Sequence, residues 1–255
     1  MNTKTVLITG ANKSIGFETA RQMGRAGYRI WLGSRDEVRG EKAVAELQSQ
    51  GVDVRLLWID VSDEASVQAA AARVNSEDGK LDILINNAGI LGDASLSPLE
   101  QSVADIRNVY ETNVFGVMRV TQAFVPLLRK AEHASIVNLS SGLGSLGWLS
   151  DPDNIYYDFN LLGYNTSKSA VNALTVAFSK ALRPLVSMST RPTRGTQRQT
   201  SMPIPDHVRF GKPLLILCGS LASQPRGRPA ATSLARNRFP GDLHHDRNGI
   251  DCYPY

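Results

Sequence analysis

The chain has 255 residues, 42% of them hydrophobic, and a formal net charge of +4; this fits one α/β domain, and no apolar run reaches the ~20 residues that cross a bilayer. The strand pattern that begins at Thr5 leaves no room for a signal peptide, so we expect a cytoplasmic protein with no membrane partner. Two cysteines exclude a disulfide framework, and the four histidines have no ligand spacing, so we expect no metal site.

Strand and helix patterns alternate through residues 1–184. In chain order they predict a strand at 5–9, a helix at 15–26, a strand at 29–33, a helix at 37–50, a strand at 54–59, a helix from 63 with Ser62 as its N-cap, a strand at 81–85, a helix at about 99–130, a strand at 135–139 and a helix at about 164–182. The strands are nearly unbroken apolar runs, which indicates burial on both faces. We therefore expect an α/β fold with a doubly wound parallel sheet, the Rossmann fold, in a single domain with an irregular C-terminal tail.

The basic charge is confined to the C-terminal part. Residues 1–184 carry a net charge of −2, whereas residues 185–255 carry +6, 8 of the 12 prolines and no glutamate. This shift predicts a boundary: a dinucleotide-binding and catalytic domain over 1–184, then a divergent, partly disordered tail over 185–255, in which the apolar run 213–218 is a candidate strand. The tail has neither interleaved aromatic residues nor a recognisable module, so we expect no nucleic-acid partner.

A glycine-rich segment, residues 9–16, lies between the first predicted strand and helix. Glycine permits a tight turn and close approach of a pyrophosphate, and the helix N-terminus offers free N–H groups to an anion. The alternative is a glycine-rich turn without a ligand. The candidate cofactor-binding residues of this turn are Gly10, Asn12, Lys13, Ser14, Ile15 and Gly16. Residues 142–147 also match G-x-G-x-x-G, but they follow the fifth strand, and residues 148–152 do not open a helix. We therefore interpret residues 142–147 as a flexible active-site loop.

Further motifs follow in order along the chain. They are Asp60-Val61 after the third strand, Asn86-Asn87-Ala88-Gly89 after the fourth, Ser140-Ser141 after the fifth and Tyr164-Asn165-Thr166-Ser167-Lys168 in the last predicted helix. With the glycine turn they resemble the short-chain dehydrogenase/reductase family, of the carbonyl-reductase-like type, over residues 1–184. The resemblance implies that Asp60 and Val61 lie at the adenine and that Asn87, Ala88 and Gly89 line the cofactor. Ser14 departs from the pattern, because the family has a glycine there, and its side chain would crowd the diphosphate.

The end of the second strand bears on the choice of cofactor. A carboxylate there would pair with the ribose hydroxyls of NAD, but this chain has Ser34 followed by Arg35. Arg35 and Lys13 can both approach a 2′-phosphate. We therefore predict NADP(H) as the cofactor, and we expect Asp36 to cap the following helix.

Tyr164 and Lys168 are four residues apart and share a helix face. A tyrosine with an ordinary pKa of ~10 is a poor acid–base group, and a neighbouring ammonium lowers that pKa. By resemblance, Tyr164 protonates a substrate carbonyl oxygen, Lys168 also holds the nicotinamide ribose, and Ser141, favoured over Ser140, polarises the carbonyl. Asn113 would support a water relay to Lys168; the alternative is a buried asparagine bonded to backbone at a helix kink.

These roles imply reduction of a small-molecule aldehyde, ketone or quinone to an alcohol by hydride transfer, with no metal. The interval from Ser141 to Tyr164, 23 residues, exceeds that of the simplest members and includes residues 151–157. Such an insertion resembles carbonyl-reductase-like members, many of them monomeric, and would shape the substrate pocket. Both a monomer and a homo-oligomer are compatible with the sequence.

The resemblance ends after Pro184. The family continues with a strand and an Asn-Ala-x-x-Pro-Gly turn, whereas residues 186–196 are polar and basic. Synonymous codons can be chosen for Met188–Thr196 so that reading them from the third base gives another peptide. That peptide is Val-Asn-Ala-Ala-His-Pro-Gly-Tyr, which resembles the missing family segment. We therefore propose a shifted frame, which the coding DNA would test; the alternative is a divergent tail with its own substrate lid. The lost turn, together with Ser14, raises a second hypothesis, a non-catalytic or impaired dinucleotide-binding protein.

Overall fold

The computed structural model describes residues 3–182 and the backbone of the strand 214–219. These residues belong to one compact unit, Met1–Ala222. The interpretations of residues 185–213 and 220–255, including the shifted frame and the missing Pro-Gly turn, lie outside the described residues. The division of the chain at residue 184 therefore stays a prediction.

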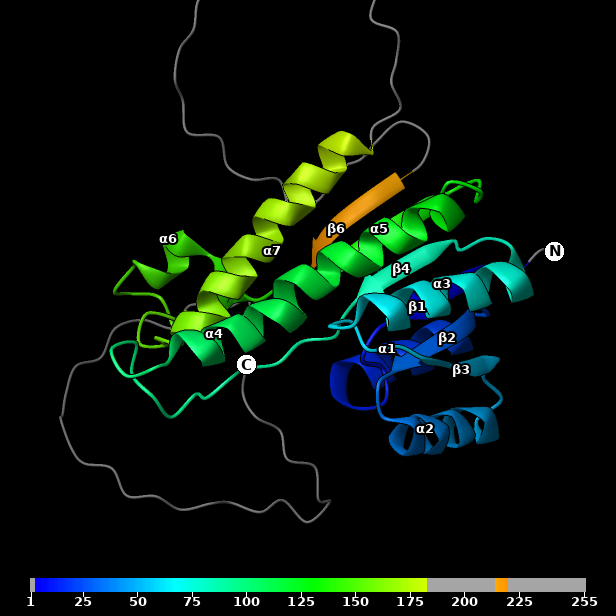
Figure 1. Cartoon of the computed structure of the whole chain (residues 1–255), viewed down its shortest axis with the longest axis horizontal. Coiled ribbons are helices and arrows are strands. Elements are labelled where there is room, and N and C mark those ends of the chain that lie inside the picture. Colours follow the sequence, from blue (N-terminus) through cyan, green and yellow to red (C-terminus); the bar gives the residue numbers. More distant parts are fainter. Residues whose placement is uncertain (1–2, 183–213, 220–255) are drawn as a thin grey trace, which may run out of the picture. The chain divides into compact units, whose positions relative to one another are not determined.

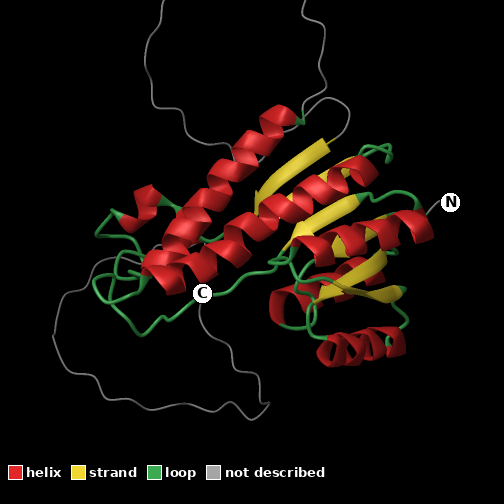
Figure 2. Cartoon of the chain, in the orientation of Figure 1, coloured by secondary structure: helices red, strands yellow, loops and turns green. Residues whose placement is uncertain are grey.

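A parallel sheet forms the centre of the described fold (Figures 1 and 2). Its strand order is β3-β2-β1-β4-β5-β6, and every neighbouring pair is parallel. The strands are β1 (Thr5–Ile8), β2 (Arg29–Ser34), β3 (Val54–Trp58), β4 (Ile83–Asn86), β5 (Ala134–Leu139) and β6 (Leu214–Gly219). The chain starts in the middle of the sheet and winds outward in both directions, which confirms the predicted doubly wound Rossmann fold.

The helices cover both faces of this sheet. Their bounds are α1 (Ser14–Arg25), α2 (Glu37–Ser49), α3 (Glu64–Asp78), α4 (Val103–Tyr110), α5 (Gly116–Leu128), α6 (Leu146–Leu149) and α7 (Leu162–Ala181). Alternate residues of β1 enter two separate cores: Leu7 packs with α3 and α5, whereas Val6 and Ile8 pack with α1 and α2. Burial on both faces explains why the strands are continuous apolar runs rather than alternating ones.

The helix predicted at 99–130 begins later and is interrupted. It starts at Val103, because the Ser102 hydroxyl accepts a hydrogen bond from the Asp105 N–H at 3.1 Å and caps the first turn. Leu99 lies outside the helix and is 98% exposed. A π-helical segment, Glu111–Phe115, then separates α4 from α5. Such segments are frequent at functional sites, and this one contains Asn113.

Two other details differ from the sequence-based expectations. The N-cap of α3 is Asp63 and not Ser62: the Asp63 carboxylate accepts the Ala65 N–H at 2.8 Å, whereas Ser62 donates to Asp60. The expectation that residues 148–152 open no helix is wrong for Trp148 and Leu149, which belong to the short helix α6; a 3₁₀ turn at Gly142–Gly144 precedes α6, and the Ser145 hydroxyl caps it. The candidate strand at 213–218 is confirmed as β6, whose backbone pairs with β5. No helix in the described part of the chain is long and apolar enough to span a membrane.

Candidate active site

The glycine turn between β1 and α1 lies tightly against the loop that follows β4. Gly10 has a positive φ of 63°, and a Cβ on it would lie 3.0 Å from the Ala88 Cα. A Cβ on Gly16 would lie 2.5 Å from the Asn87 Nδ2 and 2.8 Å from the Gly10 carbonyl oxygen. Both positions therefore require glycine, one for its backbone conformation and both for lack of space.

Hydrogen bonds join the same two segments. The Thr9 hydroxyl accepts the N–H groups of Asn87 and Ala88, both at 3.0 Å. The Asn87 side-chain amide donates to the carbonyls of Thr9 at 2.8 Å and Gly10 at 3.1 Å. The glycine turn and the Asn-Ala-Gly loop, predicted separately from sequence, thus form one surface at the carboxyl ends of β1 and β4.

Ser14 is the first residue of α1 and has a φ of +50°, the one positive φ of a non-glycine residue in the described chain. This left-handed conformation costs a residue with a Cβ about 1–2 kcal/mol. The preceding residue, Lys13, makes no side-chain cap of the helix. The first-turn N–H groups of α1 therefore have no capping side chain at Lys13, which suits the binding of an anion such as a diphosphate.

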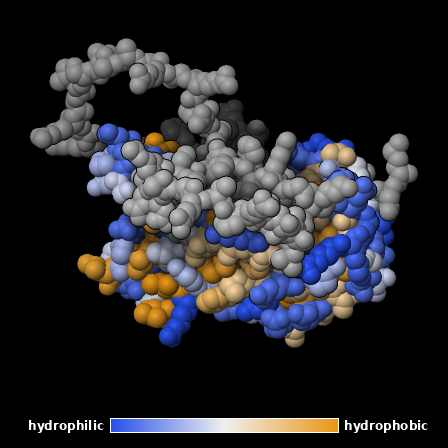
Figure 3. Space-filling view, turned by 90° about the horizontal axis from the view of Figure 1, so that it is seen from above, coloured by the Kyte–Doolittle hydropathy of each residue, from blue (hydrophilic) through white to orange (hydrophobic). Residues whose placement is uncertain are grey.

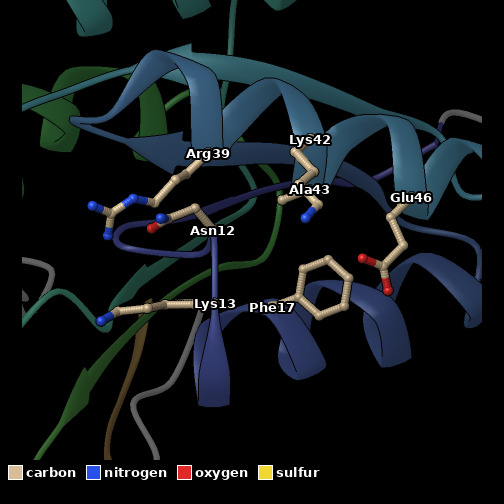
Figure 4. A pocket seen from close by; sticks show the side chains of 7 residues that line it. All are labelled: Asn12, Lys13, Phe17, Arg39, Lys42, Ala43 and Glu46. Atoms are coloured by element: carbon tan, nitrogen blue, oxygen red, sulfur yellow. The ribbon is translucent and has the colours of Figure 1, made fainter.

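Between α1 and α2 lies an open pocket of about 270 Å³. It is lined by Asn12, Lys13, Phe17, Arg39, Lys42, Ala43 and Glu46 (Figure 4). In Figure 4 the head groups of Lys13 and Arg39 extend on the same side of the pocket, with Asn12 between them, whereas the Glu46 carboxylate lies at the other end. The arrangement offers cations to a phosphate beside the glycine turn.

Sequence reasoning missed Arg39 and Lys42. A signal was present, since residues 39, 42, 43 and 46 recur at helical spacing and share one face of α2. Arg35, which it did select, is exposed and lies outside the lining of this pocket; its carbonyl oxygen accepts from the Trp58 indole at 3.2 Å. Asp36 caps α2, as expected, by accepting the Arg39 N–H at 3.0 Å, and it also pairs with the Arg39 guanidinium at 2.8 Å.

Asp60 and Val61 lie in the connection between β3 and α3. The Asp60 carboxylate accepts from both the N–H and the hydroxyl of Ser62, at 2.9 and 2.6 Å. A Cβ on Gly116 would lie 2.9 Å from the Val61 Cγ2. Val61 therefore packs closely on the first residue of α5, directly after the π-helical segment with Asn113.

Tyr164 and Lys168 stand on the first turns of α7. The Lys168 ammonium is 5.5 Å from the centre of the Tyr164 ring and donates to the Leu139 carbonyl oxygen at 2.9 Å. Lys168 is only 5% exposed. A Cβ on Gly89 would lie 3.7 Å from the Lys168 Nζ and 3.3 Å from the Asn113 Oδ1. The structure therefore brings Gly89, Asn113, Tyr164 and Lys168 together at the ends of β4 and β5.

Asn113 is held by three hydrogen bonds. Its side chain accepts the Ile90 N–H at 2.8 Å and donates to the Ile90 carbonyl at 2.9 Å and to the Ser167 hydroxyl at 3.0 Å. Both interpretations of Asn113 therefore agree with its geometry, since it bonds to backbone at an irregular helical turn and also lies near Lys168. Ser167, which sequence reasoning did not select, is fully buried and donates to the Tyr164 carbonyl at 2.7 Å.

The two serines after β5 differ in their hydrogen bonds. The Ser140 hydroxyl donates its hydrogen to the Asn172 side chain of α7 at 2.6 Å. The Ser141 hydroxyl accepts the Leu143 N–H at 3.2 Å. Because a hydroxyl both donates and accepts, this bond leaves the Ser141 hydrogen for another acceptor. The geometry favours Ser141 as the group that would polarise a carbonyl.

The geometry of the glycine turn fits a dinucleotide: glycines where a Cβ would clash, a helix N-terminus at Lys13 and Ser14, and cations beside them. Among the side chains that the structure describes, those of residues 3–182, no group of three or more His, Cys, Asp and Glu is placed to hold a metal ion.

Comparison with known proteins gives the family of the chain. The family model for short chain dehydrogenases matches residues 4–190. The chain is 40% identical over 183 residues to the short-chain dehydrogenase anuI of Penicillium roqueforti, covering 69% of this chain and 72% of that protein. It is 38% identical to (+)-neomenthol dehydrogenase of Arabidopsis thaliana over 58% of this chain and 60% of that one. The chain thus spans less than two thirds of some curated relatives.

Solved structures agree as well. Menthone neomenthol reductase from Mentha piperita has a TM-score of 0.61 and 29% identity, over 71% of this chain and 86% of that one. A gluconate 5-dehydrogenase from Burkholderia cenocepacia in complex with NADP has a TM-score of 0.62 and 26% identity, over 71% and 67%. A Burkholderia phymatum enzyme in complex with NAD has a TM-score of 0.61 and 33% identity, over 71% and 60%. Sequence motifs, sheet topology and these matches agree, and the chain belongs to the short-chain dehydrogenase family.

Proposed function

We propose that this protein is an NADPH-dependent oxidoreductase that reduces an aldehyde, ketone or quinone to an alcohol. The observation that carries the proposal is the gathering of Ser141, Asn113, Tyr164 and Lys168 around the ends of β4 and β5, beside the glycine turn. The partner is a small molecule, and we place the protein in the cytoplasm because two cysteines without a disulfide framework suit a reducing compartment.

Each residue has a role that its contacts support. The cofactor, when bound, supplies the hydride. The Ser141 hydroxyl donates a hydrogen bond to the carbonyl oxygen, and the Tyr164 hydroxyl gives that oxygen its proton. The Lys168 ammonium, 5.5 Å from the Tyr164 ring, stabilises the negative charge that the phenolate then carries. Asn113 anchors the loop after β4 to α7 through Ile90 and Ser167.

The preference for NADPH rests on charge. Ser34 ends β2 where an acid would pair with the ribose of NAD, and Asp36 is engaged as the cap of α2. Lys13 and Arg39 extend together beside the glycine turn (Figure 4), and Arg35 lies next to Ser34. These cations support recognition of a 2′-phosphate.

Replacement of Arg39 tests this preference. We expect Arg39→Ala to weaken NADPH binding about tenfold while NADH binding stays unchanged, since only NADPH carries the phosphate. Titration of cofactor fluorescence measures both constants. Arg25→Ala is the control, because Arg25 lies in the last turn of α1 and bonds to Gln50 instead. Equal losses for NADPH and NADH would contradict the role of Arg39.

Turnover tests the reaction itself. The 255-residue chain is assayed for NADPH oxidation with a panel of aldehydes, ketones and quinones. We expect Tyr164→Phe to lower kcat about 10²–10⁴-fold, because the proton donor is lost, while NADPH binding persists. Turnover that survives in Tyr164→Phe would contradict the mechanism.

One observation favours the alternative, a dinucleotide-binding protein with impaired turnover. Ser14 adopts the left-handed conformation that suits glycine and adds a side chain at the start of α1. NADPH binding without turnover on the whole panel would support this alternative.

A further inference from the structure

An aromatic cluster occupies the insertion between Ser141 and Tyr164. The Trp148 ring, in α6, stacks on the Tyr156 ring with centroids 5.7 Å apart and planes 14° apart. The Tyr156 ring also meets the Phe159 ring edge-on at 6.4 Å. Offset and edge-on pairs of this kind are attractive beyond simple burial, so the three rings hold one another in place.

Gly142, the residue directly after Ser141, lies against two rings of this cluster. A Cβ on Gly142 would lie 2.4 Å from the Tyr156 Cε2 and 3.0 Å from the Trp148 Cζ3. Two residues further on, a Cβ on Gly144 would lie 2.8 Å from the Lys168 backbone carbonyl carbon. The 3₁₀ turn Gly142–Gly144 is therefore fixed between the aromatic rings on one side and the helix of Tyr164 and Lys168 on the other.

The cluster is also accessible. Trp148 is 40% exposed and Phe159 45%, and three other large apolar residues of the same insertion are exposed as well: Leu146, Ile155 and Tyr157. In Figure 3 hydrophobic surface gathers toward the left end, the end at which Figure 1 places α6. Apolar residues that gather in this way on a surface usually mark a binding site.

We propose that the Trp148–Tyr156 pair is a specificity-determining wall of the substrate site that selects bulky, ring-bearing apolar carbonyl compounds. The inference rests on the proposed reductase function and names its substrate class. The rings touch the residue that follows Ser141, so a substrate whose carbonyl oxygen meets the Ser141 hydroxyl would place its carbon skeleton beside them. An apolar ring gains from contact with an aromatic face, whereas a methyl group such as those of acetone is too small to cover it.

Two glycines of the same segment offer a matched test. Gly142→Ala inserts a methyl group into the Tyr156 and Trp148 rings and displaces them, whereas a Cβ on Gly147 meets nothing within 4 Å. A third variant, Trp148→Ala, removes one ring without forcing the backbone. For each protein, kcat and KM are measured with 4-tert-butylcyclohexanone and with acetone, and the affinity for NADPH is measured by fluorescence.

We expect the wild type and Gly147→Ala to prefer the cyclic ketone. In Gly142→Ala and Trp148→Ala the ratio of kcat/KM for the cyclic ketone to kcat/KM for acetone should fall about tenfold, mainly through KM, the size expected for the loss of one aromatic contact. An unchanged ratio in both variants would overturn the inference, because the cluster would then only stabilise the insertion.

Binding separates this inference from the proposed function. Saturation-transfer NMR should detect the cyclic ketone on the NADP-saturated wild type and Gly147→Ala, and a weaker signal on Trp148→Ala. Such binding without turnover of any carbonyl would refute the reductase function but would still support an apolar binding site at the rings. Equal signals on all the variants would refute the site, whatever the turnover.

Discussion

The two halves of the candidate site are built differently. The half formed by the glycine turn and the loop after β4 is fixed by backbone: glycines stand where a Cβ would clash, and the Thr9 hydroxyl and Asn87 amide bind main-chain groups. The half formed by residues 142–159 depends on exposed aromatic side chains. A site fixed by backbone tolerates few side-chain changes, whereas one made of side chains can change its ligand without changing the fold.

The same substitution, glycine to alanine, should therefore be harmful in the first half and nearly neutral in the second. Gly16→Ala places a Cβ 2.5 Å from the Asn87 Nδ2 and 2.8 Å from a carbonyl oxygen, so we expect it to destabilise the fold by about 1–3 kcal/mol and to abolish measurable NADPH binding. Urea unfolding and fluorescence titration measure the two effects.

Gly147→Ala is the matched change in the other half. Gly147 is also a helical glycine, and a Cβ on it would meet open space. The unfolding free energy of the variant should therefore stay within about 0.5 kcal/mol of that of the wild type. If Gly16→Ala proved as harmless as Gly147→Ala, the glycine turn would be less constrained than its contacts indicate.

Ser167 links Asn113, which holds the loop after β4, to the helix of Tyr164, and its loss should have an intermediate effect. Ser167→Ala removes the hydroxyl that accepts from Asn113 and donates to the Tyr164 carbonyl, in a fully buried place. We expect a loss of about 1–2 kcal/mol in unfolding free energy. As a positioning residue for Tyr164, it should also lower kcat while KM for NADPH stays unchanged.

The neighbouring Thr166 provides the control. It is exposed, and its hydroxyl donates only to carbonyls of its own helix, so Thr166→Ala should leave kcat unchanged and stability within about 0.5 kcal/mol. A drop in stability without a drop in kcat for Ser167→Ala would show that Ser167 is structural only.

The smallest effect is expected at Ser14. Ser14→Gly relieves the left-handed strain of about 1–2 kcal/mol but adds glycine's backbone entropy of about 0.5–1 kcal/mol in the unfolded chain. We expect a net gain of about 0.5 kcal/mol in thermal unfolding and tighter NADPH binding.

Ser14→Ala distinguishes strain from a specific role of the hydroxyl. It keeps the Cβ in the left-handed conformation, so it should bring no gain in stability. A gain equal to that of Ser14→Gly would contradict the explanation by backbone strain.

The sequence by itself determined the features that depend on near neighbours along the chain. The apolar runs fixed the first five strands to within two residues at either end, and the spacing of Tyr164 and Lys168 placed them on one helix face. The family resemblance supplied the roles of those residues, and the position of Asp36 before α2 indicated its capping role. Such signals are local, because a helix face or a strand repeats every few residues.

Only the tertiary structure decided which side chains meet across the fold. It tied Ser140 to Asn172 and left Ser141 to donate, it joined Asn113 to Ser167 54 residues away, and it placed Arg39 beside the glycine turn. Asp63 and Ser62 are equally good caps by residue type, but Ser62 is engaged by Asp60. The physical reason is common to these cases: a hydroxyl, an amide or a guanidinium can accept several partners, and packing over long sequence separations selects one of them.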